Sequence, residues 1–582
     1  MTALTLTDLT DFPGVTIAEA DGVPVLLAPR DGNTGGGIVF RVGSAHETLA
    51  TSGITHLIEH LALRGQVLSE AHLNGQTHAD VTLFHVAGST SDVVTYLNDV
   101  CAALRELPVD RIDTEKDILR SEAEGKSPGF GGHMRISRHG ARGFGLVGYG
   151  ERGLDRITAD EVLEWAATWF TRENAVAWVT VDALPDGLDL RLPAGRRMPP
   201  PVLTDVLEGS PAYLTGLRDG VALDSVVPRG NAAHLASRVL REVLHRDLRV
   251  NADIASTLDV DYDLLDAEHA RVSVVVQGSE GQQGAAAGGL ADALSGLRFH
   301  VSDDDLAAAR AGALEELAET AAVPSADLLP SLAYRIVTGR PLEGPEQVRA
   351  QVERLTADDV RGVARHAWAS ALWYGPAAMD WAGIVPGPNW SQVRAEGRMF
   401  QRIDAPDVSL VLASDGVGLV TPDGGVTVRF ADCMLLECVP DGARVLTGAD
   451  GFRVVIEPTL YGGLGPAEVA FHVDARVPAN VVVQRPAREP GDIPVPEPPQ
   501  PAAATKGGRR AKAPGAGGRP SVTSTMARVT GLWVAAFVVL GGGQLLLSRF
   551  LDLELRLGIL PVLGLIWASV SIVRARHGKG HR

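Results

Sequence analysis

The stretch that decides the fold of this sequence is GITHLIEHLA, residues 53–62. It predicts an amphipathic helix on which His56 and His60, four residues apart, project from one face and can hold one metal ion. Glu59 lies next to His60, near enough to act on a metal-bound water without binding the metal itself. His-x-x-Glu-His is the inverted form of the zincin motif, so the pattern predicts a catalytic metal site. Two histidines at this spacing alone would more often mark an ordinary helix face.

A third ligand is expected from a later segment, because a catalytic zinc ion usually binds three protein ligands and a water. The segment 113–124 predicts a helix that carries three candidate glutamates. Glu115 and Glu122 are seven residues apart, which is two turns, so they share one face, whereas Glu124 points away from it. The residues alone leave Glu115 and Glu122 as candidates.

The composition indicates an acidic globular protein. The 582 residues are 45% hydrophobic and 21% charged, which predicts several domains. The net charge is −18, and residues 506–582 carry twelve basic and two acidic side chains, so the rest of the chain is strongly acidic. An acidic surface argues against nucleic acid as a partner, because phosphate binding needs basic side chains. Cys101, Cys433 and Cys438 give no disulfide framework and indicate a reducing compartment.

A proline-rich joint at 193–201 separates two units, and strands alternate with helices in both. The first has expected strands at 15–29, 37–44, 81–86 and 174–181 and further helices at 91–107 and 159–170, and the second has expected helices at 231–250, 302–322 and 356–369 and a strand at 270–277. An internal repeat is therefore expected, although the second unit has no His-x-x-Glu-His. Thr51 and Ser52 are candidate caps of the motif helix. The glycine-rich stretch 125–150 is expected to be a loop with a broken helix.

The residues after the second unit differ from it in composition and in their expected secondary structure. Short β runs predict a small β-rich domain at 399–483, with a faint similarity to β-barrels of the pleckstrin-homology type. Residues 484–528 are rich in Pro, Ala and Gly and carry a basic cluster, so we expect a disordered linker. Two uncharged apolar runs, 529–548 and 557–573, predict a transmembrane hairpin at 529–573. Basic residues flank both outer ends, which places the soluble domains on the cytoplasmic side of the cell membrane. Consistently, the N-terminus has no signal-peptide pattern.

Several segments around the motif helix resemble the pitrilysin, insulin-degrading enzyme and mitochondrial processing peptidase family of inverzincin zinc metallopeptidases. The similar segments are Gly43-Ser44-Ala45-His46-Glu47 (Gly-Ser-x-x-Glu), residues 53–60 (Gly-x-x-His-x-x-Glu-His), Asn74-Gly75-Gln76-Thr77 (Asn-Ala-x-Thr), Glu115-x6-Glu122 (the paired glutamates) and Asn174-Ala175-Val176 (the closing strand). Residues 200–395 are similar to the second, non-metal half. The resemblance implies an α+β fold with two tandem peptidase-like α/β sandwich domains, 1–195 catalytic and 196–398 without metal.

The resemblance also implies roles for single residues. Glu122 would complete the site of one Zn²⁺ per chain with the two histidines, and Glu115 would orient that site from behind. Glu59 would take a proton from the zinc-bound water and pass it to the leaving amine of a hydrolysed peptide. In the family, the residue corresponding to Asn74 lies by an edge strand to which substrate pairs. Asn74 could equally be a turn residue.

The second half departs from the family in one respect. Family members often carry an Arg and a Tyr there that help to hold the substrate and its oxyanion. The corresponding region, 244–255, has Arg246 and Arg249 but no Tyr. The family encloses substrate between two such pairs of domains, and this chain has one pair. A second copy or a homologous peptidase-like chain is therefore expected to complete the chamber, and the sequence leaves both open.

The sequence thus predicts a membrane-anchored cytoplasmic zinc metalloendopeptidase, with peptides as substrates and the lipid bilayer as a further partner. The alternative is a catalytically inactive peptidase-like scaffold, or a substrate-docking subunit of a membrane complex. Inactive members usually lose a metal ligand or the glutamate base, whereas this sequence keeps all four candidate residues. That retention favours the enzyme.

Overall fold

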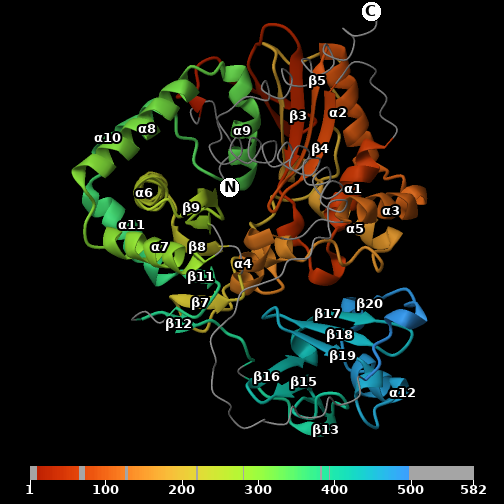
Figure 1. Cartoon of the computed structure of the whole chain (residues 1–582). Coiled ribbons are helices and arrows are strands. Elements are labelled where there is room, and N and C mark those ends of the chain that lie inside the picture. The colour runs from red at the N-terminus through yellow and green to blue at the C-terminus, as the bar shows by residue number, and fades with distance from the viewer. Residues whose placement is uncertain are drawn as a thin grey trace, which may run out of the picture.

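The chain contains three groups of strands, each with its own packed core. The computed structural model describes residues 9–64, 72–124, 129–217, 220–278, 281–379, 383–391 and 393–496. Two six-stranded sheets covered by helices are followed by two four-stranded sheets. In Figure 1 the first sheet is red to orange, the second unit is mostly green, and the β-rich part is cyan to blue. Helices and strands therefore occur together, as predicted for an α+β fold.

The first sheet has the strand order β1-β2-β6-β3-β5-β4, with β4 at one edge. Its strands are β1 (Thr16–Ala20), β2 (Val23–Leu27), β3 (Thr34–Phe40), β4 (His72–Thr77), β5 (Thr82–Gly88) and β6 (Ala175–Val179). β2 and β6 pair in parallel, and the other neighbours pair antiparallel. β6 is buried along its whole length, which explains its continuous apolar sequence AVAWV.

The described residues of this first unit form five α-helices. They are α1 (Ile54–Leu63), α2 (Thr90–Arg105), α3 (Ile112–Ala123), α4 (Gly129–His139) and α5 (Ala159–Trp169). The prediction of a loop with a broken helix at 125–150 was wrong where α4 lies, because α4 is a regular helix. Its glycines give it poor helix propensity, but tertiary packing of its buried residues stabilises it.

Five strands of the second unit repeat the order and pairing of five strands in the first, whereas the edge strand β12 pairs in parallel with β7 and β1 pairs antiparallel with β2. The second sheet has the order β12-β7-β11-β8-β10-β9, and the inner pair β7–β11 is parallel, as β2–β6 is. The strands are β7 (Ala212–Thr215), β8 (Gly220–Pro228), β9 (Ala255–Leu264), β10 (His269–Gly278), β11 (Leu372–Gly375) and β12 (Val385–Pro386), and the helices are α6 (Asn231–Leu244), α7 (Gln283–Leu297), α8 (Asp303–Ala321), α9 (Ser325–Thr338), α10 (Pro345–Arg354) and α11 (Ala357–Ala369). The expected internal repeat is thus present in the strand pairing.

One helix of each unit packs against the sheet of the other unit. α9 belongs to the second unit in sequence, yet its residues Leu329 and Ala333 pack in one buried cluster with Trp178 of β6 in the first sheet. Conversely, α4 of the first unit buries Met134 against Leu372 of β11. Figure 1 shows α9 beside β3 and α4 beside β11. This exchange locks the two units together.

A buried ion pair reinforces that exchange. Arg138 of α4 is 1% exposed, and its Nε donates to the carboxylate of Asp224 in β8 at 2.5 Å. Its Nη2 donates to the backbone carbonyls of Asp224 and Ser370, both at 2.7 Å. Burial alone would raise the pKa of the Asp224 carboxyl, but Arg138 and Arg271 outweigh it and hold that pKa well below its usual range. The Asp224 carboxylate is therefore charged, and its burial is tolerated because the two arginines compensate that charge.

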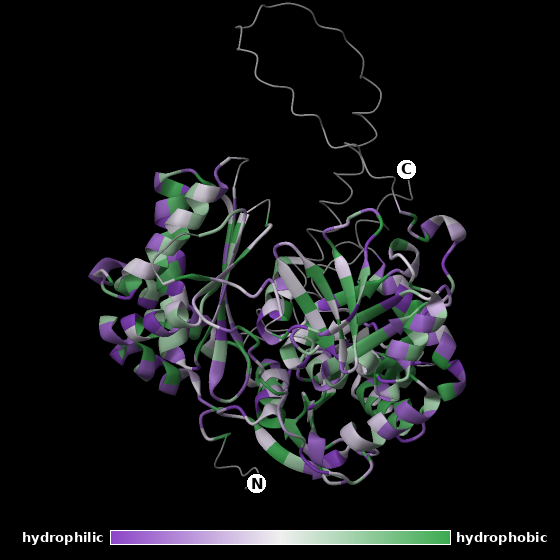
Figure 2. Ribbon diagram, turned by 90° about the horizontal axis from the view of Figure 1, so that it is seen from below, coloured by the Kyte–Doolittle hydropathy of each residue, from purple (hydrophilic) through white to green (hydrophobic). Residues whose placement is uncertain are grey.

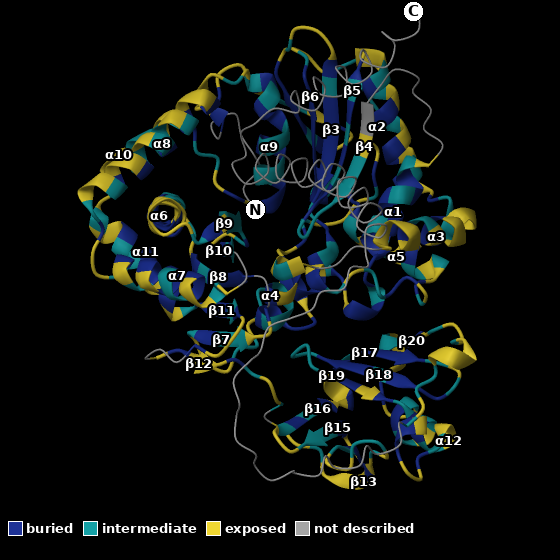
Figure 3. Ribbon diagram, in the orientation of Figure 1, coloured by how far each residue is buried: buried dark blue, intermediate teal, exposed yellow. Residues whose placement is uncertain are grey.

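Apolar side chains gather between the sheets and their helices. In Figure 2 hydrophobic residues are frequent in the strands, although some strands are mixed, and the outer helices carry many hydrophilic residues. Figure 3 shows the central strands, such as β3, buried, while α8 and α10 expose their outer sides. Two separate clusters of buried apolar residues result, one in each unit.

The β-rich domain consists of two four-stranded sheets around one core. The strands are β13 (Gly397–Gln401), β14 (Ser409–Ala413), β15 (Gly416–Thr421), β16 (Gly424–Arg429), β17 (Cys433–Cys438), β18 (Arg444–Gly448), β19 (Arg453–Ile456) and β20 (Val482–Gln484), with the short helix α12 (Pro466–Val469). The strand orders are β13-β14-β15-β16 and β19-β18-β17-β20, and the two sheets share one buried apolar cluster. Cys433 and Cys438 are free thiols in this core.

The predicted transmembrane hairpin, 529–573, lies outside the described residues, as does most of the linker 484–528. Within the ranges that are described, no helix has the length and apolar character needed to cross a membrane.

Replacing Arg138 by methionine (Arg138→Met) should lower the free energy of unfolding by about 3 kcal/mol, because Asp224 would keep a buried charge without one of its two arginines. Urea denaturation followed by circular dichroism measures this loss. Arg361→Met is the control, since Arg361 pairs with an exposed Asp358 on the same helix and should cost under about 1 kcal/mol. Equal, small losses in both variants would contradict the role of the buried pair.

Candidate metal centre

The motif helix α1 begins in a way that the sequence did not reveal. Its N-cap residue is Gly53, in the left-handed conformation with φ 97°, and neither Thr51 nor Ser52 caps it. The carboxylate of Glu47 instead accepts hydrogen bonds from the N–H groups of Gly53 and Thr55, each at 2.9 Å. The capping prediction was therefore wrong, because a side chain six residues upstream of Gly53 satisfies the free N–H groups.

Glu47 is nearly enclosed, at 7% exposure. Burial raises the pKa of its carboxyl to about 7, although the hydrogen bonds from Thr55 and Gly53 act in the opposite direction. The first N–H groups of the motif helix are thus bound by a carboxyl group whose pKa is raised to about 7.

α1 turns its apolar face to the core and its histidines toward α3. Leu57, Ile58 and Leu61 are 0% exposed. The rings of His56 and His60 lie on the other side with centroids 4.8 Å apart. The helix prediction and the shared face of the two histidines are both confirmed by this geometry.

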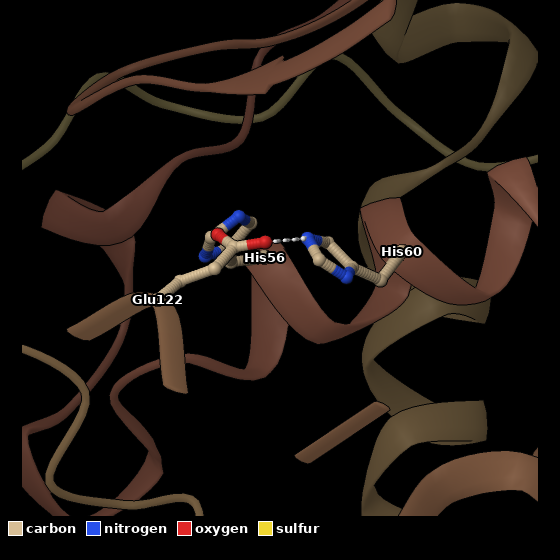
Figure 4. A group of neighbouring side chains, drawn as sticks. All are labelled: His56, His60 and Glu122. Carbon is tan, nitrogen blue, oxygen red and sulfur yellow. Dashed lines mark ion pairs between the residues drawn. The ribbon is translucent and has the colours of Figure 1, made fainter. Parts of the chain in front are cut away.

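The two candidate glutamates of α3 reach different nitrogens of the same imidazole. Oε1 of Glu122 lies 3.8 Å from Nε2 of His60, and Figure 4 shows its carboxylate directed at that ring. Oε2 of Glu115 lies 3.5 Å from Nδ1 of His60, on the opposite edge of the ring. Glu115 is buried and also pairs with Arg64 at 2.7 Å, whereas the side chain of Glu122 is 43% exposed. This arrangement distinguishes the two residues that spacing alone left equivalent.

A further carboxylate, missed in the sequence, holds the other histidine. Oε1 of Glu151 lies 2.5 Å from Nδ1 of His56. Burial alone would lower the pKa of His56, but the hydrogen bond and charge of Glu151, with Glu59 and Glu122 nearby, raise it instead. Glu151 follows the glycine-rich stretch at no motif spacing from His56, so only the tertiary fold identifies it.

Glu59 lies under the edge strand β4. It is 4% exposed, and Oγ1 of Thr77 donates to its Oε2 at 2.7 Å. Burial raises its pKa, while the charge of His56 and the Thr77 hydrogen bond oppose that rise. A Cβ on Gly75 would lie only 2.6 Å from Oε1 of Glu59, so glycine lets this strand pass close to the carboxylate.

Asn74 lies within β4, so it is an edge-strand residue and not a turn residue. Its carbonyl accepts a hydrogen bond from the hydroxyl of Tyr96 at 2.9 Å. A cavity of about 190 Å³ opens next to this region, lined among others by His56, Thr77 and Glu151. Of the predicted site residues, His56 lines this cavity, together with the newly found Glu151.

The donor set suits zinc. His56, His60 and Glu122 each offer one ligand atom, and these three atoms lie within 4.8 Å of one another. Ligand atoms around a tetrahedral zinc ion lie about 3.3 Å apart, so modest side-chain movement would bring them into place. Two imidazoles with one carboxylate match zinc better than calcium or magnesium, which prefer oxygen ligands. Because Glu151 and Glu115 occupy the Nδ1 edges, the Nε2 edges are left for the metal.

Arg246, one of the two arginines noted in the second unit, is not free to contact a substrate. Residues His245–Asn251 form a π-helical turn after α6, which fits the predicted helix at 231–250. Arg246 in this turn pairs with Asp305 of α8 and with Asp247. Its guanidinium is therefore already engaged by carboxylates.

No family model matches this sequence, and no curated protein matches it either. Solved structures share its fold. A protease from Helicobacter pylori is 16% identical with a TM-score of 0.53, over 62% of this chain and 100% of that one. The first half of the periplasmic protease PqqL from Escherichia coli is 14% identical, with a TM-score of 0.51 over 62% and 92%. A peptidase M16 inactive domain from Pseudomonas fluorescens is 15% identical, with a TM-score of 0.52 over 64% and 98%.

These comparisons show that the chain has the fold of M16 peptidases, the pitrilysin-like fold that the sequence resemblance implied. Identities of 14–16% carry the fold alone. Proteases and an inactive domain both occur among the similar structures, so the chemistry has to be argued from the residues of this chain.

The variant Glu47→Gln tests the buried carboxyl that caps α1. Because the folded-state pKa of Glu47 is raised from 4.5 to about 7, its protonated form favours folding, and that contribution is lost as pH rises through 7. Relative to wild type, the variant should therefore gain about 3 kcal/mol of stability between pH 4 and pH 8. Urea denaturation of metal-free protein across this range measures the difference. The exposed Glu124→Gln is the control, and a pH-independent difference for Glu47→Gln would refute the assignment.

Proposed function

We propose that this chain is a zinc metalloendopeptidase in which His56, His60 and Glu122 hold the metal and Glu59 acts as the general base. The observation that carries the proposal is the convergence of three ligand atoms within 4.8 Å of one another. The buried carboxylate of Glu59 stands on the same helix, one residue from His60. The M16 fold supports the proposal, because proteases are among the structures that share it.

When bound, zinc would lower the pKa of a water ligand to near 7 and polarise the carbonyl of a peptide bond. Glu115 and Glu151 would hold the Nδ1 edges of the two histidines and so fix the orientation of both rings. Thr77 would hold Oε2 of Glu59, which leaves Oε1 to accept a proton from the attacking water and pass it to the leaving amide nitrogen. The raised pKa of Glu59 suits a group that must both take and release a proton.

Substrate would bind in extended form along β4. This strand lies at the edge of the first sheet, next to Glu59, and an extended peptide can add to such an edge through backbone hydrogen bonds. Asn74 lies in the same strand with its side chain exposed, where it can contact the substrate. Endopeptidase action on unfolded or flexible peptides follows from this mode of binding.

A second peptidase-like chain would complete the enclosure of the substrate. The three candidate ligands and Glu59 all come from the first unit, and the π-helical turn of the second unit offers no Tyr for an oxyanion. A second copy of this chain or a homologous chain would supply that wall. The apolar runs at 529–548 and 557–573 support a membrane anchor, with the enzyme on the cytoplasmic face of the cell membrane.

The alternative is a catalytically inactive scaffold or substrate-docking subunit of a membrane complex. Two observations favour it: an inactive M16 domain shares the fold, and residues 244–255 contain no Tyr. Such a protein could still bind zinc and peptide, so metal binding and turnover have to be measured separately.

Metal analysis of the purified protein tests the metal site. We expect about one zinc per chain, lost in Glu122→Gln because one of three protein ligands is removed. Glu124→Gln is the matched control, since Glu124 stands two residues away and lies outside the ligand group. Wild-type protein that binds no zinc, or Glu122→Gln with undiminished zinc, would contradict the metal site.

Cleavage of a fluorogenic peptide library tests the base. Glu59→Gln should retain zinc and lower kcat at least about 100-fold, because the amide cannot accept the proton. Undiminished cleavage in Glu59→Gln would overturn the proposal. A zinc-loaded wild type without turnover would favour the scaffold.

Thr77→Val tests the support of the base. The valine keeps the shape of threonine but removes the 2.7 Å hydrogen bond to Glu59, so kcat should fall about tenfold with KM and zinc content unchanged. Thr34→Val is the control, since the hydroxyl of Thr34 bonds Thr90 and does not contact the site. Wild-type kcat in Thr77→Val would contradict this role of the hydroxyl.

A further inference from the structure

The β-rich domain contacts the segment that leads into the motif helix. Leu49 and Ala50, just before α1, pack in one buried cluster with Leu435 of β17 and Val483 of β20, and all four are 0% exposed. Figure 1 shows β17 and β20 on the side of the β-rich domain that faces the first unit. The entry of α1, and with it His56, therefore rests on this domain.

The same domain holds the loop that carries Glu151. Glu437 of β17 accepts hydrogen bonds from Nη1 of Arg152 at 3.0 and 3.1 Å. Nη2 of Arg485, which follows β20, donates to the carbonyl of Arg152 at 3.1 Å. Arg152 is the neighbour of Glu151 in sequence, so both contacts act one residue away from the partner of His56. The N–H of Gly153 further ties this loop to Ser52 at the start of α1.

A bridge through Asp155 extends the contact to α3. Asp155 accepts from Nη1 of Arg485 on one side and from Nη2 of Arg120 on the other, the latter at 2.7 Å. Arg120 lies two residues before Glu122 on α3. Arg485 therefore touches, directly or through one carboxylate, the segments that carry Glu151 and Glu122.

Glu437 is the centre of this network. It is 6% exposed, and Arg152, Arg453 and Arg485 all pair with it. A buried carboxylate with three arginines is well compensated, but each arginine then depends on it for its position. The network is more than a loose surface contact, because its central charge is out of water.

We propose that the β-rich domain braces the metal centre, with Glu437 and Arg485 as positioning residues that fix the Glu151 loop and α3 relative to α1. The inference rests on the proposed zinc site and assigns a function to a domain that carries none of the metal ligands. Carboxylates that orient ligand histidines typically change metal affinity or activity by 10–100-fold when disturbed, so loosening their support should weaken metal binding.

The test compares two arginines of the β-rich domain in the full-length protein. Arg485→Met removes the contacts to Asp155, Glu437 and the Arg152 carbonyl. Arg488→Met is the matched control, because Arg488 has nearly the same side-chain exposure, 24% against 22%, but pairs with Asp441 and Glu457 inside the domain. Zinc affinity is measured by competition with a chromogenic chelator, and kcat and KM are measured separately.

We expect Arg485→Met to bind zinc about tenfold more weakly and to lose kcat with little change in KM. Arg488→Met should match wild type, and both variants should keep the wild-type circular dichroism spectrum. Equal zinc affinity in the two variants, with wild type binding zinc, overturns the brace and leaves the proposed function standing. A wild type that binds no zinc overturns both.

Asp155→Asn reaches the same bridge from the first unit, so the test does not depend on the folding of one variant. It should also weaken zinc binding. The double variant Arg485→Met/Asp155→Asn should have the same zinc affinity as whichever single variant binds zinc less tightly. Losses that multiply in the double variant would show two independent effects and would overturn the bridge.

Discussion

The orientation of two imidazoles by two carboxylates is the constraint on which the site depends. His56 and His60 stand on one helix, but each ring could rotate about its side-chain bonds. Glu151 engages Nδ1 of His56 at 2.5 Å, and Glu115 engages Nδ1 of His60 at 3.5 Å. Because these carboxylates come from separate segments, the orientation of the two rings is a product of tertiary packing and not of α1 alone.

The sequence predicted the parts of this site that depend on local periodicity. The spacing of His56, Glu59 and His60 on α1 is a helical repeat, as is that of Glu115 and Glu122 on α3. The role of Glu47 as a cap of α1, and Glu151 altogether, escaped prediction because neither residue is linked to α1 by a helical or strand period. Their contacts exist only once the chain has folded around α1.

In the fold, too, the elements with a local sequence pattern were predicted and those that depend on tertiary contacts were not. Strands with continuous or alternating apolar residues were predicted, whereas the region of α4, with its glycines, was predicted to be a loop with a broken helix. The helix is stabilised by packing on the second sheet, through Met134 and the buried Arg138–Asp224 pair. The exchange of α4 and α9 between the units, and the support of α1 and α3 by the β-rich domain, are long-range arrangements that no window of the sequence displays. The geometry of the proposed metal centre therefore depends on contacts between distant parts of the described chain.

X-ray absorption at the zinc K-edge of the zinc-loaded protein tests the central claim most directly, because it reports the ligand atoms themselves. The account predicts a first shell of nitrogen and oxygen at about 2.0–2.1 Å, with the outer-shell scattering of two imidazole rings. A shell that contains sulfur, one with a single imidazole, or one of six oxygens would contradict it.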